Sequence, residues 1–326
     1  PPLTTGYFHP DEAEWLTYAN TLISDPIFWI TDIIASTRIF TVLPLLLFSI
    51  LGFEMNFLIG KLANLFGWLI ICGLCYRLLF KISNKHSLIL LSPLMISLLH
   101  WNLYSNVTFN SEIPGIIGFL LVFILIQGNM DDAGEMPKKQ LYICGLISSI
   151  FPLIKLNFGL FSLIIYLFFV FHAKSKFQTI KILFLSWMSI WLPFFMFLAA
   201  TSEIASFNGF VIGHFGYAAD GHSGEHTVLD QVGLIESIWV TLRHIYSPLD
   251  LRPIVCSLSA LLFGVIVLLK MKKQLWKSLS GKVIQLGIVF LVGSFLTAFI
   301  PKSKLPNHVI LYFFFLYLLT VIVYAS

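Results

Sequence analysis

The stretch FLIGKLANLFGWLIICGLCYRLLF, residues 57–80, decides the fold class of this chain. Its only charged residues are Lys61 and Arg77, and as an α-helix it is long enough to cross the roughly 30 Å hydrocarbon core of a bilayer. The alternative is a transmembrane barrel, which would show strands of about ten alternating residues instead of one long apolar run. The stretch therefore predicts a membrane-spanning helix.

The composition of the whole chain supports the same fold class. Hydrophobic residues make up 58%, charged residues only 11%, and the mean hydropathy is +0.89. A soluble domain carries about 25% charged residues, so this chain has too little polar surface to cover a water-soluble globule. The net charge of +4 is modest and indicates no nucleic-acid partner. We predict an all-α polytopic membrane protein with about nine or ten transmembrane helices.

Hydropathy also predicts where these helices lie. The apolar segment 39–53 contains Pro44 and, at about 15 residues, is marginal for a full crossing, so we expect an interfacial element there. The predicted spans are 57–80, 87–104, 113–127, 141–155, 157–172, 179–200, 251–269, 283–300 and 306–325.

Lysines and arginines gather in every second loop between the predicted spans, as the positive-inside rule requires of cytoplasmic loops. The remaining loops then face outward: 1–56, 105–112, the turn near 155–157, 201–250 and 301–305. The chain thus divides into an outer-face loop with interfacial helices and an acidic motif, 1–56, and a transmembrane helical domain, 57–326, with its outer loop 201–250. We also expect a helix upstream of Pro1 if the native N-terminus is cytoplasmic.

The first outward segment contains the tetrapeptide His9-Pro10-Asp11-Glu12. One interpretation is a helix start, because proline is tolerated in the first helical turn and acids there complement the helix dipole. The other is that the paired carboxylates carry out chemistry on a lipid-borne substrate. Both interpretations can hold together, since a helix start can also present a reactive side chain.

Two further charged residues stand at predicted outer helix ends. Glu112 precedes Ile113-Pro114, where it either stabilises a helix N-terminus or faces a cavity as a second carboxylate. Lys155 lies at or just inside the end of an apolar span, where a lysine indicates function unless it snorkels to the interface.

The later outward loops carry candidate ligands for anions and metals. Lys302 and Lys304, with His308 close behind, run against the positive-inside trend, and a lipid-linked phosphate or pyrophosphate would explain them. His222, Glu225 and His226 are weak candidates for a zinc or manganese site, because their spacing is not that of a strong ligand set. A flexible lid is the alternative for that loop.

Taken together, these motifs resemble the GT-C superfamily of polytopic glycosyltransferases. The tetrapeptide is similar to the H-P-D-E of eukaryotic mannosyltransferases. Thr41–Phe53, Lys155 and the basic turn from Lys302 to His308 stand where that family has an apolar segment, an outer-end lysine and a late basic turn. The late turn does not match the H-K-E-E-R-F-like element of the mannosyltransferases, so the resemblance indicates a bacterial-type relative and gives no support for mannose specificity.

The resemblance implies a glycosyltransferase that takes a sugar from a polyprenyl-phosphate-linked donor. Asp11 would be the catalytic base or metal ligand, with Glu12 as its nearest rival, and Glu12 or Glu112 would orient the acceptor. Lys302, Lys304 or Arg38 would stabilise the leaving phosphate. His9, Lys155 and His308 complete the expected substrate-binding residues.

The sequence therefore predicts an enzyme of the bacterial inner (plasma) membrane with its active site on the outer face. Expected partners are the polyprenyl-phosphate donor, a lipid- or glycan-linked acceptor and membrane lipids. No cofactor is certain, and a divalent metal is an open alternative. Two other functions stay open: a polysaccharide polymerase or ligase, and a transporter or flippase of a lipid carrier. A transporter would favour charges and broken helices at mid-membrane, whereas here charges cluster at the outer helix ends.

Overall fold

The computed structural model of the 326-residue chain describes residues 10–25, 39–82, 112–131, 135–155, 158–200 and 279–299, with 314–316, 318, 319 and 322. Every regular element among these residues is an α-helix, as predicted. The helices are α1 (Pro10–Ser24), α4 (Ile39–Ile50), α5 (Phe57–Ile82), α8 (Glu112–Asn129), α9 (Lys138–Ile154), α10 (Gly159–His172), α11 (Lys176–Ala200) and α17 (Leu279–Phe299).

Three helices in the described part of the chain are long and apolar enough to cross a membrane: Phe57–Lys81, Glu112–Asn129 and Lys176–Met196. They support the prediction of a membrane protein, but they do not support the count of about nine or ten spans. One reason is length, because α10 has 14 residues and reaches only about 21 Å at 1.5 Å per residue. The predicted spans 87–104 and 251–269, and most of 306–325, lie outside the described residues.

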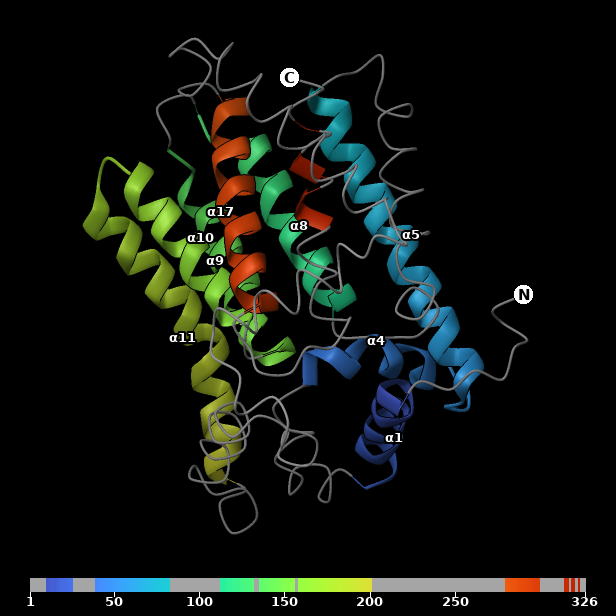
Figure 1. The fold of residues 1–326 in the computed structure, drawn as a ribbon. Helices are drawn as coiled ribbons and strands as arrows, with labels where there is room; N and C mark the ends of the chain where they lie inside the picture. The colour runs from blue at the N-terminus through green and yellow to red at the C-terminus, as the bar shows by residue number, and fades with distance from the viewer. Residues whose placement is uncertain are drawn as a thin grey trace, which may run out of the picture.

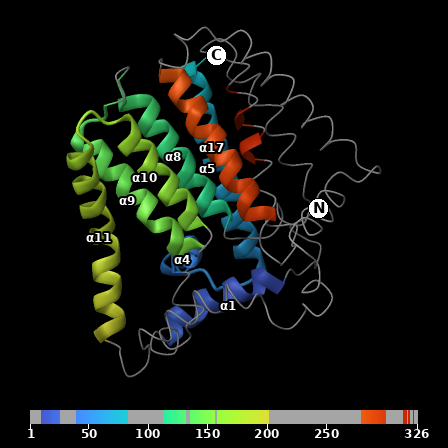
Figure 2. The same ribbon diagram turned by 60° about the vertical axis from the view of Figure 1, so that its left-hand side comes forward.

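The helices from α8 to α11 run up and down in one bundle (Figures 1 and 2). Lys155, just after α9, reaches Glu112 at the start of α8, so these two neighbours are antiparallel. In contrast, α5 and α8 run in the same direction, and near their C-terminal ends the Gln127 amide donates to the Leu78 carbonyl at 3.2 Å. The direction of each helix decides which loops share an end of the bundle.

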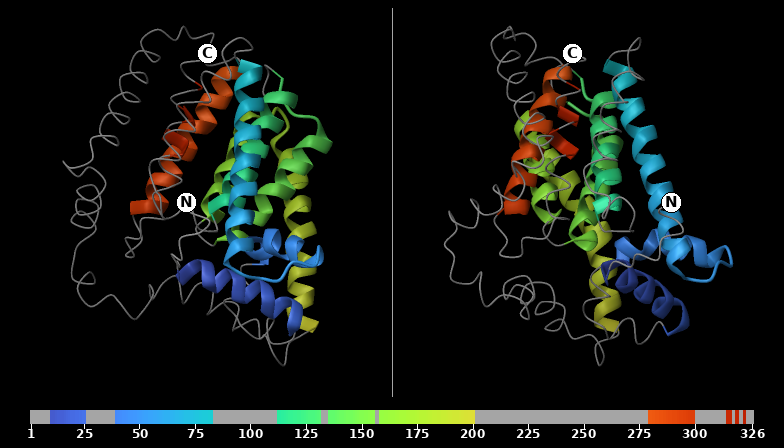
Figure 3. Two further views of the ribbon diagram at one scale, coloured as in Figure 1. Left: turned by 90° about the vertical axis from the view of Figure 1, so that its right-hand side faces the viewer. Right: turned by 45° about the vertical axis from the view of Figure 1, so that its right-hand side comes forward.

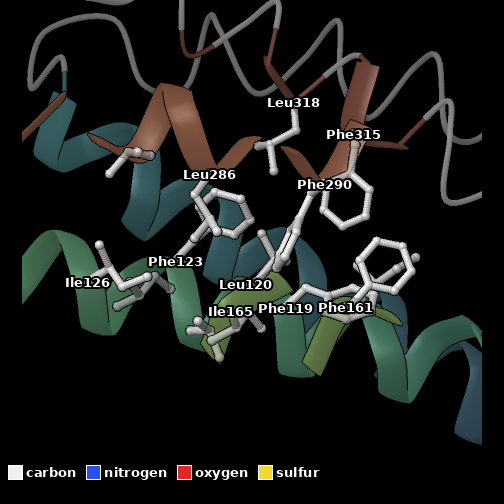
Figure 4. Packing of buried hydrophobic residues seen from close by; sticks show 14 of the residues in the cluster. Phe119, Leu120, Phe123, Ile126, Phe161, Ile165, Leu286, Phe290, Phe315 and Leu318 are labelled. Atoms are coloured by element: carbon white, nitrogen blue, oxygen red, sulfur yellow. The ribbon is translucent and has the colours of Figure 1, made fainter. Parts of the chain in front are cut away.

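The core of the bundle is built from phenylalanine rings (Figure 4). Phe119 of α8 lies at its centre, with ring centroids 4.7 Å from Phe161 of α10, 5.4 Å from Phe290 of α17 and 5.5 Å from Phe315. Tilted and edge-on ring pairs of this kind add to the energy of simple burial. Residues far apart in the sequence thereby fix α8, α10 and α17 against one another.

A polar seam joins α9, α10 and α11. The Ser149 hydroxyl lies 2.6 Å from the Tyr166 hydroxyl, and the Trp191 indole donates to the Ser149 carbonyl at 3.0 Å. Gly145 allows this close approach, because a Cβ at that position would collide with the Ser186 side chain. Small residues and interhelical hydrogen bonds are the usual means of packing helices in a membrane.

Two short helices lie across one end of the bundle (Figure 3). The first, α1, buries Trp15 and Ala19 in a cluster with Val42 and Leu45 of α4 and Ala63 of α5. The second, α4, has 12 residues with Pro44 inside and is too short to cross a bilayer, as expected for segment 39–53. The Thr41 hydroxyl of α4 donates to the Ile154 carbonyl at 2.8 Å, which ties α4 to the last turn of α9.

Candidate functional site

The candidate site lies at the end of the bundle that α1 and α4 cover, and its centre is an ion pair. The ammonium Nζ of Lys155 lies 2.6 Å from Oε1 of Glu112. The glutamate side chain is 4% exposed and the lysine side chain 23% exposed. The carboxylate is therefore buried, while the lysine keeps part of its surface open.

Glu112 is the first residue of α8, where its charge faces the positive end of the helix dipole. The acid stands at a helix N-terminus, as the first interpretation of Glu112 predicts, and it pairs with a cation. That Glu112 faces a cavity as a second carboxylate stays a prediction. The pairing matters because a buried carboxylate without a partner is strongly unfavourable.

Lys155 is placed by the end of α9. Its backbone is extended, with φ −156° and ψ 131°, so the helix stops there. The Lys155 N–H donates to the Phe151 carbonyl at 3.1 Å, and the Lys155 carbonyl accepts from the Phe158 N–H at 2.8 Å. Phe158 immediately precedes α10, and its ring lies 6.0 Å from the lysine ammonium.

Asp11 and Glu12 lie in the first turn of α1, so the prediction of a helix start at Pro10 is confirmed. Because α1 packs against α4 and α5, the helix that carries Asp11 and Glu12 lies at the same end of the molecule as the ion pair (Figure 3). Their side chains are not described, so a shared cavity with Glu112 stays a prediction. The other predicted site residues lie outside the described residues: His9, Arg38, His222, Glu225, His226, Lys302, Lys304 and His308.

The sequence analysis missed two residues at this end. Lys61 is 6% exposed in the second turn of α5, and a lysine inside an apolar run was itself the available signal. Thr41 was missed because nothing local predicts that its hydroxyl caps a carbonyl of a helix far along the chain.

The residues that the structure describes contain no group of three or more histidine, cysteine, aspartate or glutamate side chains that could hold a metal ion. The weak candidates His222, Glu225 and His226 lie outside the described residues.

The fold and the site together define an all-helical membrane protein with a buried lysine–glutamate pair at one end of its bundle. Comparisons of the chain with protein-family models, with curated proteins and with solved structures gave no match.

Proposed function

We propose that this chain is a glycosyltransferase that moves a sugar from a polyprenyl-phosphate-linked donor to a lipid- or glycan-linked acceptor. One arrangement carries the proposal: the helix that starts with the H-P-D-E-like motif packs at the same end as the Lys155–Glu112 ion pair. An acid and a lysine at the edge of an apolar bundle suit a substrate that is half lipid and half sugar.

The proposed reaction is a single displacement. The acceptor hydroxyl oxygen attacks the anomeric carbon of the donor, and the bond between that carbon and the phosphate oxygen breaks. The hydroxyl proton passes to the Asp11 carboxylate, which acts as general base. Polyprenyl phosphate leaves with the bonding electron pair, and the anomeric centre is inverted.

The cations have a separate task in this proposal. Lys302, Lys304 and Arg38 stabilise the negative charge that develops on the leaving phosphate. Lys155 contributes in the same way from its partly exposed position, while Glu112 holds the lysine in place. Glu12 is the nearest rival to Asp11 as the base and otherwise orients the acceptor, and His9 and His308 complete the substrate contacts.

We further propose a multi-pass arrangement in a bacterial inner membrane with this site on the outer face. It is supported by the distribution of cations: Lys81, Lys174 and Lys282 lie at the end of the bundle opposite α1 and α4, as the positive-inside rule expects of the cytoplasmic end.

The decisive experiment measures sugar transfer in membranes that contain the Asp11→Asn variant. A panel of radiolabelled polyprenyl-phosphate hexoses and pentoses serves as donors, because the sugar is unidentified. We expect transfer to fall about 10²- to 10⁴-fold, the range that a general base contributes. Full activity in this variant would exclude Asp11 as the base.

Asp25→Asn is the matched control, because it makes the same chemical change just beyond the other end of α1. We expect its transfer rate to stay within about twofold of the unchanged protein. If no donor supports transfer and the protein instead translocates a lipid carrier, the chain is a transporter and the proposal fails.

A further inference from the structure

A pocket of about 150 Å³ lies at the end of the bundle opposite the candidate site. It is formed by residues where α9 begins, α10 ends and α11 begins. Its lining is divided between polar residues and an apolar wall made by Met136, Leu141, Phe169 and Ile182. The same pocket therefore offers both polar contacts and a surface for hydrocarbon.

Two helix N-termini meet at this pocket. Lys138 is the first residue of α9. The residue that caps this helix, Pro137, provides no side-chain hydrogen bond to the free N–H groups of the first turn. Ser175 precedes α11 and lines the pocket together with Gln178 and Thr179 of that helix. The first N–H groups of a helix have no partner inside the helix and favour a bound anion.

Thr179 adds a second polar group to the pocket. Its side chain lines the pocket and is only 8% exposed. Its hydroxyl is therefore available to form a hydrogen bond with a group that enters the pocket.

The charge around the pocket favours an anion. Lys138 lines it, and Lys174 stands beside it in an ion pair of 3.4 Å with Glu135. Glu135 also lines the pocket and opposes an anion, but its partner Lys174 offsets that charge. Lys138 then remains to pair with a singly charged phosphate diester.

We propose that this pocket binds the phosphate group of an anionic phospholipid headgroup. The phosphate contacts Lys138, the Thr179 hydroxyl and the first turn of α11, and an acyl chain lies along Leu141 and Ile182. The apolar wall favours a lipid over free phosphate, and basic pockets between membrane helices are known binding places for such headgroups. The proposal does not depend on glycosyl transfer.

The test is native mass spectrometry of the full chain in detergent, titrated separately with phosphatidylglycerol, phosphatidylcholine and inorganic phosphate. We expect phosphatidylglycerol to bind, and the double variant Lys138→Gln, Thr179→Val to bind it at least about tenfold more weakly. The matched control Lys181→Gln, Thr21→Val removes one lysine and one hydroxyl outside the pocket and should change binding less than about twofold.

A conservative variant guards against an effect of misfolding. Lys138→Arg keeps the charge and should keep the binding of phosphatidylglycerol. Equal binding of phosphatidylcholine and phosphatidylglycerol, or undiminished binding by the pocket variant, would overturn the proposal. Inorganic phosphate could also bind as tightly as phosphatidylglycerol and lose its binding in the same variant. That result would overturn the assignment to a lipid headgroup and would assign the pocket to free phosphate.

Discussion

The two ends of the bundle each carry a lysine–glutamate pair, and the pairs differ in almost every physical respect. At the end covered by α1 and α4, Lys155 and Glu112 are 2.6 Å apart, with side chains 23% and 4% exposed. At the opposite end, Lys174 and Glu135 are 3.4 Å apart, with side chains 66% and 44% exposed. The same two residue types therefore form one buried contact and one solvated contact.

The difference shows how location determines what an ion pair does. A solvated pair contributes about 0–1 kcal/mol, because water screens both charges. A buried pair offers little net stability over an apolar replacement, yet removal of one partner costs about 3–5 kcal/mol. A buried pair at a helix end therefore makes the stability of that end sensitive to substitution of either residue. This is consistent with a site that must hold its charges in place.

The largest effect is expected from Lys155→Met, which leaves the Glu112 carboxylate buried without its cation. We expect the free energy of unfolding to fall by about 3–5 kcal/mol. The measurement is unfolding by SDS titration in mixed micelles, followed by tryptophan fluorescence. A loss of less than about 1 kcal/mol would place this pair in the same class as the solvated one.

The double variant Glu112→Gln, Lys155→Met tests the cause of that loss. With the carboxylate also removed, we expect most of the lost stability to return, because no unpaired charge remains buried. If the double variant is as unstable as Lys155→Met alone, packing of the lysine stem explains the loss and charge does not.

A smaller effect is expected from Gly115→Ala, one turn into α8 from Glu112. A Cβ at this position would collide with the ring of Phe158, which is itself buried. We expect a loss of about 1–3 kcal/mol in the same SDS titration.

Gly128→Ala at the other end of α8 is the matched substitution. Its Cβ would lie 3.0 Å from the Lys81 ammonium, the far end of a flexible side chain that can move away. We expect no loss, and a gain of up to about 1 kcal/mol from the higher helix propensity of alanine. Equal losses from the two glycine variants would contradict the difference between the ends.

Thr41→Val removes the hydrogen bond between α4 and the last turn of α9. The Ile154 carbonyl then loses a buried donor, so we expect a loss of about 1–2 kcal/mol. Hydrogen exchange of the α4 amides provides a second measurement, and faster exchange there with unchanged exchange in α8 would localise the effect. Unchanged exchange in α4 would mean that apolar contacts alone hold this helix.

The smallest effect is expected from Lys174→Gln, which breaks the solvated pair. We expect less than about 1 kcal/mol at low ionic strength and almost nothing at 0.5 M salt, because added salt screens exposed charges. The effect of Lys155→Met should be nearly independent of salt. A salt dependence shared by both variants would remove the distinction between the two ends.

Much of the fold could be predicted from local sequence. Predicted spans 57–80 and 113–127 coincide within a few residues with α5 and α8, because long apolar runs with few charges have few alternatives in lipid. The helix start at Pro10 was equally predictable from proline and acid preferences in a first turn. The number of membrane crossings was not predictable from the sequence, because hydropathy alone does not distinguish a full span from a 14-residue helix such as α10.

The candidate site could be predicted only in part. Glu112 and Lys155 were both selected as unusual charges at helix ends, but their contact was not predictable from sequence separation. The contribution of Thr41 gave no sequence signal, because a threonine in an apolar segment usually bonds locally. For Asp11, the structure adds the position of its helix, and its role as a base stays a prediction.

The sequence by itself determined that this chain is an all-helical membrane protein. The length of its apolar runs and the positions of its charged residues are local properties, and they decide which segments enter the bilayer. Only the tertiary structure decided that Lys155 meets Glu112 and that Lys174 stays in solvent beside Glu135. The physical reason is that burial and pairing depend on which helices pack together. Here contacts among distant phenylalanines and a seam of serines fix that packing.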